Sequence, residues 1–319
     1  MNEILKAVIM LVIGFVLLIK GADFFVDGSA SVARRFRVPP IIIGLTIVAM
    51  GTSLPECAVS ISASITNNNT LAVSNVTGSN IFNLMMVCGV CALFRPLPVE
   101  IGTLKKEFPF SIACAALLLG LGYWGMSLDR VDGIIFCVIF ILFLLWMVRS
   151  AIKARKEMPG VEHEGEEAAF ILPMWQCALC IVGGAIAIAV GGDWVVDSAV
   201  TIATAFNISQ TIIGLTIVAL GTSLPELVTG IVAARKGEVD MAMGNVIGSN
   251  IFNILFVLGA ASVVSPIPFL MENVYDIIIL LVVSLLVWVY GWTKKEITRM
   301  EGLSMVIVYI AYTVYICIR

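Results

Sequence analysis

The stretch GLTIVAMGTSLPE at residues 44–56 returns almost unchanged as GLTIVALGTSLPE at residues 214–226. Each copy lies inside a long apolar run, where a proline interrupts helical hydrogen bonding and a carboxylate is costly to bury. The copies are 170 positions apart, and the same offset aligns residues 44–90 with 214–260 without a gap and with 25 identities in 47 positions. This repeat predicts a chain built from two duplicated units.

The composition is typical of a membrane protein. Of the 319 residues, 60% are hydrophobic and 13% charged, and the mean hydropathy is +1.05. Apolar runs of roughly 18 or more residues recur along the chain, which favours membrane-spanning helices over the short alternating segments of a β-barrel. We expect an all-α membrane protein with ten transmembrane helices, at approximately 3–33, 39–66, 70–94, 108–125, 129–149, 171–204, 209–235, 239–264, 275–292 and 301–317.

Basic residues are concentrated in every second loop. Fifteen of the 19 Lys and Arg residues lie near 34–38, 95–107, 149–170, 235–238 and 293–300. The positive-inside rule places these loops in the cytoplasm and both termini outside the cell. Five helices, an odd number, separate a residue from its copy, so the second unit is predicted to be inverted. We expect a first five-helix repeat at 1–150, a cytoplasmic connecting loop at 151–170 and an inverted repeat at 171–319.

The prolines predict a break in helices two and seven. Pro55 has no N–H, and its ring clashes with the carbonyl four residues earlier, at Gly51. We therefore expect a break between residues 50 and 55 that leaves the carbonyls of Ala49, Gly51 and Thr52 without helical partners. Ser53 adds a hydroxyl oxygen, and Glu56 falls in the first turn of the second half-helix. The second unit supplies the same groups from the opposite side, namely Ala219, Thr222, Ser223 and Glu226.

A polar stripe follows each break. Its members are spaced i, i+4, i+8 and therefore share one helical face: Asn75, Ser79 and Asn83 in the first unit and Asn245, Ser249 and Asn253 in the second. Asn80 and Asn250 lie about 100° away on the helix, and we interpret them as hydrogen-bonding partners between helices. Carboxylate, carbonyl, amide and hydroxyl oxygens are the ligands of hard cations, notably Ca²⁺. The two units together predict a cation site at their interface, near the middle of the membrane.

Other polar features have simpler interpretations. A single Ser, Asn or Pro in a membrane helix often has only a structural role, whereas a buried Glu is a candidate functional residue. The repeat-matched acids Asp23, Asp27, Asp193 and Asp197 are interpreted as structural partners of basic or backbone groups. The acidic run at 160–167 is interpreted as a solvated loop. The cysteines, including the spaced pairs at 88/91 and 177/180, are interpreted as small apolar residues.

These motifs resemble those of the cation/calcium antiporter superfamily, most closely its sodium/calcium exchanger branch. The phrases GTSLPE and GNVIGSN carry the resemblance, and it covers both halves of the chain. It implies exchange of three Na⁺ for one Ca²⁺ at clustered sites that both ions occupy in turn, with no cofactor beyond these ions. The implied ligands are Glu56, Glu226, the carbonyls of Ala49, Thr52, Ala219 and Thr222, and the side chains of Ser53, Ser223, Ser79, Ser249, Asn83 and Asn253.

The chain departs from the pattern of that superfamily in four places. Asn253 stands where several members, including the potassium-dependent exchangers, have Asp, which argues against K⁺ co-transport. The first unit reads SNVTGSN at 74–80 instead of GNVIGSN. The GNxxE motif of the proton/calcium branch is missing, because Gly78 and Gly248 occupy the position of its acid. The loop near 150–170 is too short for the regulatory domains of animal exchangers, which favours a compact, microbial type.

The predicted function is therefore Na⁺/Ca²⁺ antiport by alternating access in the plasma membrane, electrogenic and independent of K⁺. An antiporter of the same fold that exchanges H⁺ for Ca²⁺, or that carries another divalent cation, stays open as an alternative, and a cation channel is a weaker one. An enzyme is not expected, because Ser53 and Ser223 have no nearby His or Lys base. Apart from the transported ions and the lipid bilayer, nothing indicates a nucleic-acid or obligate protein partner.

Overall fold

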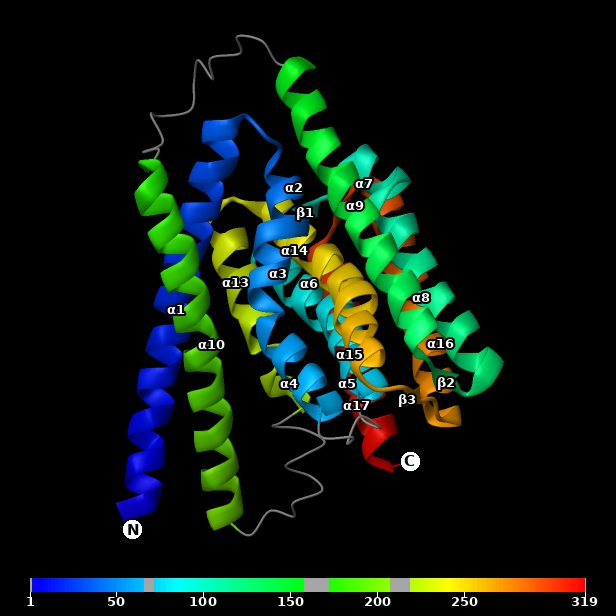
Figure 1. Cartoon of the computed structure of the whole chain (residues 1–319). Helices are drawn as coiled ribbons and strands as arrows, with labels where there is room; N and C mark the ends of the chain where they lie inside the picture. Colours follow the sequence, from blue (N-terminus) through cyan, green and yellow to red (C-terminus); the bar gives the residue numbers. More distant parts are fainter. Residues whose placement is uncertain (1, 66–71, 158–171, 207–218, 319) are drawn as a thin grey trace.

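The computed structural model describes residues 2–65, 72–157, 172–206 and 219–318, and most of them are helical (Figure 1). The acidic run at 160–167 and the first part of the expected span 209–235 lie outside the described residues. The elements of the first half are α1 (Asn2–Phe36), α2 (Pro40–Ile43), the π-helical η1 (Gly44–Val48), α3 (Ala49–Thr52), α4 (Leu54–Ile65), α5 (Ala72–Phe82), the π-helical η2 (Asn83–Val87), α6 (Cys88–Phe94), β1 (Leu97–Pro98), α7 (Ile101–Lys105), α8 (Glu107–Gly125), β2 (Ser127–Leu128) and α9 (Arg130–Glu157).

The second half follows the same order of elements. It comprises α10 (Met174–Ala205), α12 (Ala219–Gly221), α13 (Leu224–Lys236), α14 (Val239–Phe252), the π-helical η4 (Asn253–Leu258), α15 (Gly259–Val264), β3 (Ile267–Pro268), α16 (Met271–Lys294), β4 (Glu296–Ile297) and α17 (Arg299–Ile318). Within the described residues, eight helices are long and apolar enough to cross a membrane, and the bent pair Pro40–Thr52 and Leu54–Ile65 makes a ninth. The chain is therefore an integral, multi-pass membrane protein.

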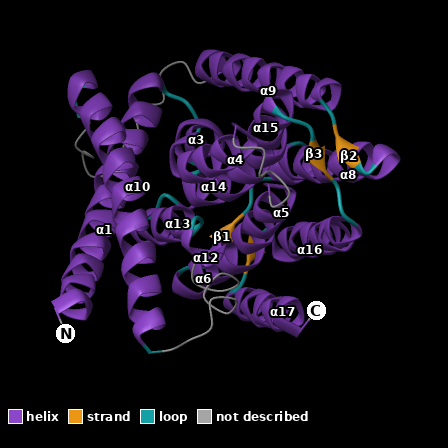
Figure 2. Ribbon diagram, turned by 60° about the horizontal axis from the view of Figure 1, so that its bottom comes forward, coloured by secondary structure: helices purple, strands orange, loops and turns teal. Residues whose placement is uncertain are grey.

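Helices α1 and α10 lie side by side at one edge of the molecule, beside the remaining bundle (Figures 1 and 2). Small residues every seven positions bring the two helices together: Gly14, Gly21 and Gly28 on α1 face Gly191, Gly184 and Cys177 on α10. A Cβ atom added at any of the three α1 glycines would lie within 3.0 Å of an atom of α10. Buried apolar side chains of this pair belong to a cluster separate from the main core, which also includes residues of α2, η1, α13 and α14.

The two spans that carry the polar stripes lie at the centre of the bundle. The most apolar windows of Ala72–Phe94 and Val239–Val264 are 78% and 83% buried, against 44% or less for the other unbroken spans. The backbone of α14 approaches η1 so closely that a Cβ on Gly44 would lie 2.5 Å from the Met241 carbonyl oxygen. This contact fixes the first broken span of one unit against the central span of the other.

Short antiparallel strand pairs join loops from the two halves. Leu97 and Pro98 of β1 pair with Ile297 and Glu296 of β4, and Ser127 and Leu128 of β2 pair with Pro268 and Ile267 of β3. The β1–β4 pair joins two of the loops rich in Lys and Arg, whereas β2–β3 joins two loops that lack this enrichment. We call the side formed by the Lys- and Arg-rich loops the basic face.

The close crossing at Gly248 gives a stability prediction. A Cβ there would lie 2.6 Å from the Leu45 carbonyl oxygen and 2.7 Å from its Cα, so backbone would have to move. We expect Gly248→Ala to lower the free energy of unfolding by about 1–3 kcal/mol. Thermal unfolding in detergent would measure this, with Gly120→Ala as the control because a Cβ at Gly120 meets nothing within 4 Å. Equal unfolding temperatures for the two variants would contradict the prediction.

Candidate cation-binding site

Both GTSLPE motifs interrupt a helix. In the first unit α3 ends at Thr52 and α4 begins at Leu54, and the two segments are bent by 49° at Ser53. In the second unit α12 ends at Gly221, and α13 begins at Leu224 after a two-residue turn. The prolines occupy the first turns of α4 and α13, where a missing N–H costs little. Each break thus aims the N-terminus of a half-helix, with its partial positive charge, into the bundle.

The carbonyl of Ala49 differs from our expectation. We predicted that it would lack a helical partner, but it accepts the backbone N–H of Ser53 at 3.1 Å and the Thr52 hydroxyl at 3.4 Å. The reason is that the helix continues to Thr52 before it bends. The prediction for Thr52 itself holds: within the described residues, its carbonyl receives no backbone N–H across the break.

The two acidic side chains are fully buried and are held by serines of the opposite motif. The Ser53 hydroxyl donates to Glu226 Oε1 at 2.7 Å, and the Ser223 hydroxyl donates to Glu56 Oε1 at 3.4 Å. Both carboxylates therefore lie where the two breaks meet. Each also falls in the first turn of its half-helix, where the helix dipole stabilises negative charge.

Several buried oxygens around the breaks have no hydrogen-bond partner. They are one carboxylate oxygen of each glutamate and side-chain oxygens of the neighbouring ligand candidates: Glu56 Oε2, Glu226 Oε2, Asn83 Oδ1, Asn253 Oδ1, Ser79 Oγ and Thr222 Oγ1. An unpartnered buried oxygen is costly, and it is most costly on a carboxylate, so a group that includes one oxygen of each glutamate indicates a ligand set. Among the described residues no three His, Cys, Asp or Glu side chains group together, so only neutral oxygens can supplement the two carboxylates.

The amides of the two central spans form a reciprocal network. Asn80 Nδ2 donates to the Asn250 carbonyl at 3.2 Å, and Asn250 Nδ2 donates to the Asn80 carbonyl at 3.1 Å. Asn83 Nδ2 donates to Asn250 Oδ1, and Asn253 Nδ2 donates to Asn80 Oδ1. The interpretation of Asn80 and Asn250 as partners between helices is confirmed. Because the amide nitrogens of Asn83 and Asn253 are used in this way, their unpartnered oxygens point elsewhere.

The helices change geometry at these same positions. The π-helical segments η2 and η4 begin at Asn83 and Asn253, at matching points of the repeat. Such wide turns are frequent at functional sites. Sequence periodicity gave no sign of them, because one extra residue per turn barely alters an apolar pattern.

The two units are not in equivalent states. Thr52 Oγ1 donates to Asn245 Oδ1 at 3.1 Å, and Ser249 Oγ is 3.5 Å from the same oxygen. In the repeat-related position, Thr222 Oγ1 lacks a partner. A nearly identical sequence therefore adopts two different arrangements on the two sides of the site.

Two apolar residues close to the breaks were missed by sequence reasoning. A Cβ on Gly51 would lie 2.5 Å from the Phe25 ring of α1, and one on Gly221 would lie 2.2 Å from Val196 of α10. The glycines therefore let α1 and α10 pack directly over the breaks. The glycine in each GTSLPE motif was visible, but its neighbour could not be identified without the tertiary structure.

The acidic residues outside the motifs have different outcomes. Asp23 and Asp27 form ion pairs with Lys236, as the structural interpretation expects. Within the described residues Asp193 and Asp197 have no ion-pair partner. The seven cysteines whose side chains are described are free thiols in helices.

Comparison with known proteins agrees with this geometry. The family model described as "Sodium/calcium exchanger protein" matches residues 6–149 and 177–318. The chain is 44% identical to the putative antiporter CaxA of Alkalimonas amylolytica over 82% of both chains, and 31% identical to the sodium/calcium exchanger MaX1 of Methanosarcina acetivorans over 96% of this chain and 97% of that one. A solved structure of the sodium–calcium exchanger NCX_Mj superposes with a TM-score of 0.83 at 30% identity, covering 98% of this chain and 99% of that one.

The fold and these similarities define a membrane transporter of cations rather than an enzyme. The chain belongs to the sodium/calcium exchanger protein family.

Proposed function

We propose that the chain exchanges Na⁺ for Ca²⁺ across the plasma membrane by alternating access. The observation that supports this most directly is the set of unpartnered buried oxygens contributed by both units around Glu56 and Glu226. Oxygen ligands of mixed type suit both hard cations, so the same cluster can hold either ion in turn. Its ligands are the two glutamates with Ala49, Thr52, Ser53, Ser79, Asn83, Ala219, Thr222, Ser223, Ser249 and Asn253.

The architecture in this proposal is a ten-helix inverted repeat with broken helices two and seven. The units are 1–150 and 171–319, joined by the loop at 151–170. The basic face is cytoplasmic and both termini are extracellular, in keeping with the positive-inside rule. The pairing of loops from the two halves on each face supports this arrangement, because helices of inverted units must interlock in this way.

The charge of the site explains the coupling. Two ionised carboxylates give an empty site of about −2, which is costly to carry across a membrane interior. One Ca²⁺ neutralises the pair and three Na⁺ leave it at +1, so both loaded forms cross more readily than the empty one. Asn253 adds no third negative charge, in keeping with transport that does not require K⁺.

The packing suggests which part moves. Helices α1 and α10 pack closely against each other, and Phe25 and Val196 of this pair lie over the glycines of the two breaks. Sliding of this pair across the bundle would uncover the site first on one side and then on the other. Small residues allow α1 and α10 to pack closely and move together, and Gly51 and Gly221 present no side chain to the pair as it moves.

Voltage dependence tests the three-to-one exchange. When Ca²⁺ enters Na⁺-loaded proteoliposomes, one net positive charge leaves per cycle, so an inside-positive potential favours uptake. At equilibrium, each 100 mV is worth about 2.3 kcal/mol, or about a 50-fold change in the Ca²⁺ gradient. Radiolabelled Ca²⁺ uptake under a clamped membrane potential would measure it. A gradient unaffected by potential would contradict this stoichiometry.

Ion substitution separates the alternatives. We expect uptake to stop when the Na⁺ gradient is collapsed and to continue when choline replaces all K⁺. Uptake driven by a pH gradient in the absence of Na⁺ would identify a proton-coupled antiporter instead. Ca²⁺ flux that needs no counter-ion on the other side would identify a channel.

A further inference from the structure

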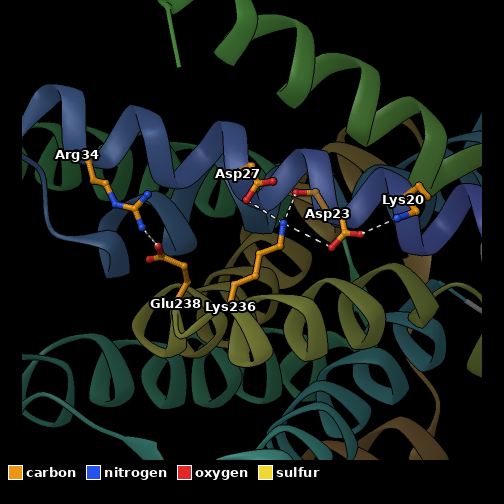
Figure 3. Close-up of polar contacts among 6 residues, drawn as sticks. All are labelled: Lys20, Asp23, Asp27, Arg34, Lys236 and Glu238. Atoms are coloured by element: carbon orange, nitrogen blue, oxygen red, sulfur yellow. Dashed lines mark hydrogen bonds and ion pairs between the residues drawn. The ribbon is translucent and has the colours of Figure 1, made fainter. Parts of the chain in front are cut away.

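Lys236, at the end of α13, reaches two acids on α1. Its ammonium lies 2.8 Å from Asp27 Oδ1 and 3.5 Å from Asp23 Oδ1, and it donates to the Asp23 carbonyl oxygen at 2.9 Å (Figure 3). The acids are spaced i, i+4 and so share the face of α1 that meets α13. Lys20 adds a weaker contact to Asp23 at 3.7 Å. The lysine therefore ties α1 to α13 at three oxygen atoms.

A second ion pair lies further along α1, toward the basic face. Arg34 in the last turn of α1 pairs with Glu238, the residue immediately before α14 (Figure 3). We call the five residues Asp23, Asp27, Arg34, Lys236 and Glu238 the basic-face latch. The latch connects α1 to α13 and to the start of α14, which meet at this face.

The latch occurs in one half of the chain only. The repeat offset carries Asp23 and Asp27 onto Asp193 and Asp197, but it carries Lys236 onto Thr66, Arg34 onto Thr204 and Glu238 onto Asn68. The acids are thus present twice, and the cations that pair with them once. The asymmetry therefore follows from the amino-acid sequence, so it is present whichever face the site is open to.

The packing shows the same asymmetry. Helix α13 runs from Glu226 in its first turn to Lys236 at its end, and α1 packs along it. Helix α4 runs from Glu56 toward the opposite face, yet among the described residues its repeat-related neighbour α10 hardly touches it. Between the site and the basic face, α1 therefore covers α13. Between the site and the opposite face, α10 covers α4 much less.

From these contacts we propose that the basic-face latch positions α1 against α13 and holds the site closed toward the basic face, so that the two sides of the transporter bind Ca²⁺ with unequal apparent affinity. This inference rests on the proposed function. Opening toward the basic face requires α1 to leave α13, which breaks every contact of the latch. No charged contact of this kind opposes opening on the other face within the described residues.

The size of the effect follows from the exposure of the pairs. The Lys236 side chain is 29% exposed and that of Glu238 is 12% exposed. Partly exposed ion pairs are individually weak and screened by salt, so removing Lys236 should shift the equilibrium between the two states by about three- to tenfold. The shift should shrink at high ionic strength.

The experiment compares the two faces of the full-length protein. Initial Ca²⁺ uptake is measured in Na⁺-loaded right-side-out and inside-out membrane vesicles, giving a half-saturating Ca²⁺ concentration for each face. We expect Lys236→Gln to lower this concentration on the basic face and raise it on the other, changing their ratio about three- to tenfold. The double variant Asp23→Asn/Asp27→Asn should change the ratio in the same direction.

Two controls distinguish the latch from a general loss of charge or fold. Arg235→Gln removes the same charge one residue away, where the described residues supply no ion-pair partner, and should leave the ratio unchanged. The charge exchange Lys236→Asp/Asp27→Lys should restore the ratio toward that of the unaltered chain. Equal ratios for Lys236→Gln and Arg235→Gln, or no recovery on charge exchange, would overturn the latch. Absence of Na⁺-dependent uptake in the unaltered chain would instead overturn the proposed function.

Discussion

Replacing either Glu56 or Glu226 with glutamine is expected to reduce Na⁺-dependent Ca²⁺ uptake roughly 100-fold or more. The substitution keeps the shape of the side chain but removes one of the two negative charges that balance Ca²⁺. It also replaces the unpartnered carboxylate oxygen Oε2 by one end of a neutral amide, either its oxygen or its NH₂ group. The serine of the opposite motif keeps an acceptor, so the helix break itself should persist.

The unfolding temperature of the same variants should not fall in ion-free buffer. Two like charges buried together destabilise the ion-free protein, so each glutamine variant should be at least as stable as the unaltered chain in ion-free buffer. Added Ca²⁺ should stabilise the unaltered chain and leave the variants unchanged, because binding stabilises only a state that binds. Glu107→Gln is a matched control, since Glu107 is half-buried outside the site. A variant that kept its Ca²⁺-induced shift would contradict the assignment.

Asn250→Leu is expected to lower the free energy of unfolding by about 1–3 kcal/mol and to reduce transport about tenfold. The change removes the amide that donates to the Asn80 carbonyl and the oxygen that accepts from Asn83. Asn83 then loses the contact that orients its own oxygen toward the ligand cluster. The effect on transport should appear as a higher half-saturating Ca²⁺ concentration as well as a lower rate.

The reciprocal network offers internal checks on that result. Asn80→Leu should act in the same way through Asn253. The double variant should cost less than the sum of the two, because the four hydrogen bonds hold the same pair of helices together and the second loss acts on a crossing that the first has already loosened. Thr77 lies on the same helix as Asn80, and its buried hydroxyl has no hydrogen-bond partner. Thr77→Val should therefore be neutral or slightly stabilising. Fully additive losses for the two asparagines would show that the network does not act as a unit.

Much of the fold could be predicted because its signals are local. Long apolar runs, the duplicated offset and the position of the prolines each depend on short stretches of sequence. They located most of the described spans within a few residues, although α9 runs on to Glu157, and the first break falls inside the predicted interval 50–55. The π-helical turns at Asn83 and Asn253 were not predicted, because they arise from packing at the centre of the bundle rather than from local preference.

The sequence by itself determined that this protein crosses the membrane, that it is built twice, and that each copy breaks a helix beside a glutamate. These features follow from the chemistry of single residues: proline lacks an N–H, and a carboxylate in lipid needs a function. Only the tertiary structure decided that Ser53 pairs with Glu226, that Lys236 joins Asp23 and Asp27, and that Thr52 has a partner where Thr222 has none. Near-identical repeats cannot encode which copy of a contact is made, because that depends on how the helices cross and on which side of the site is closed.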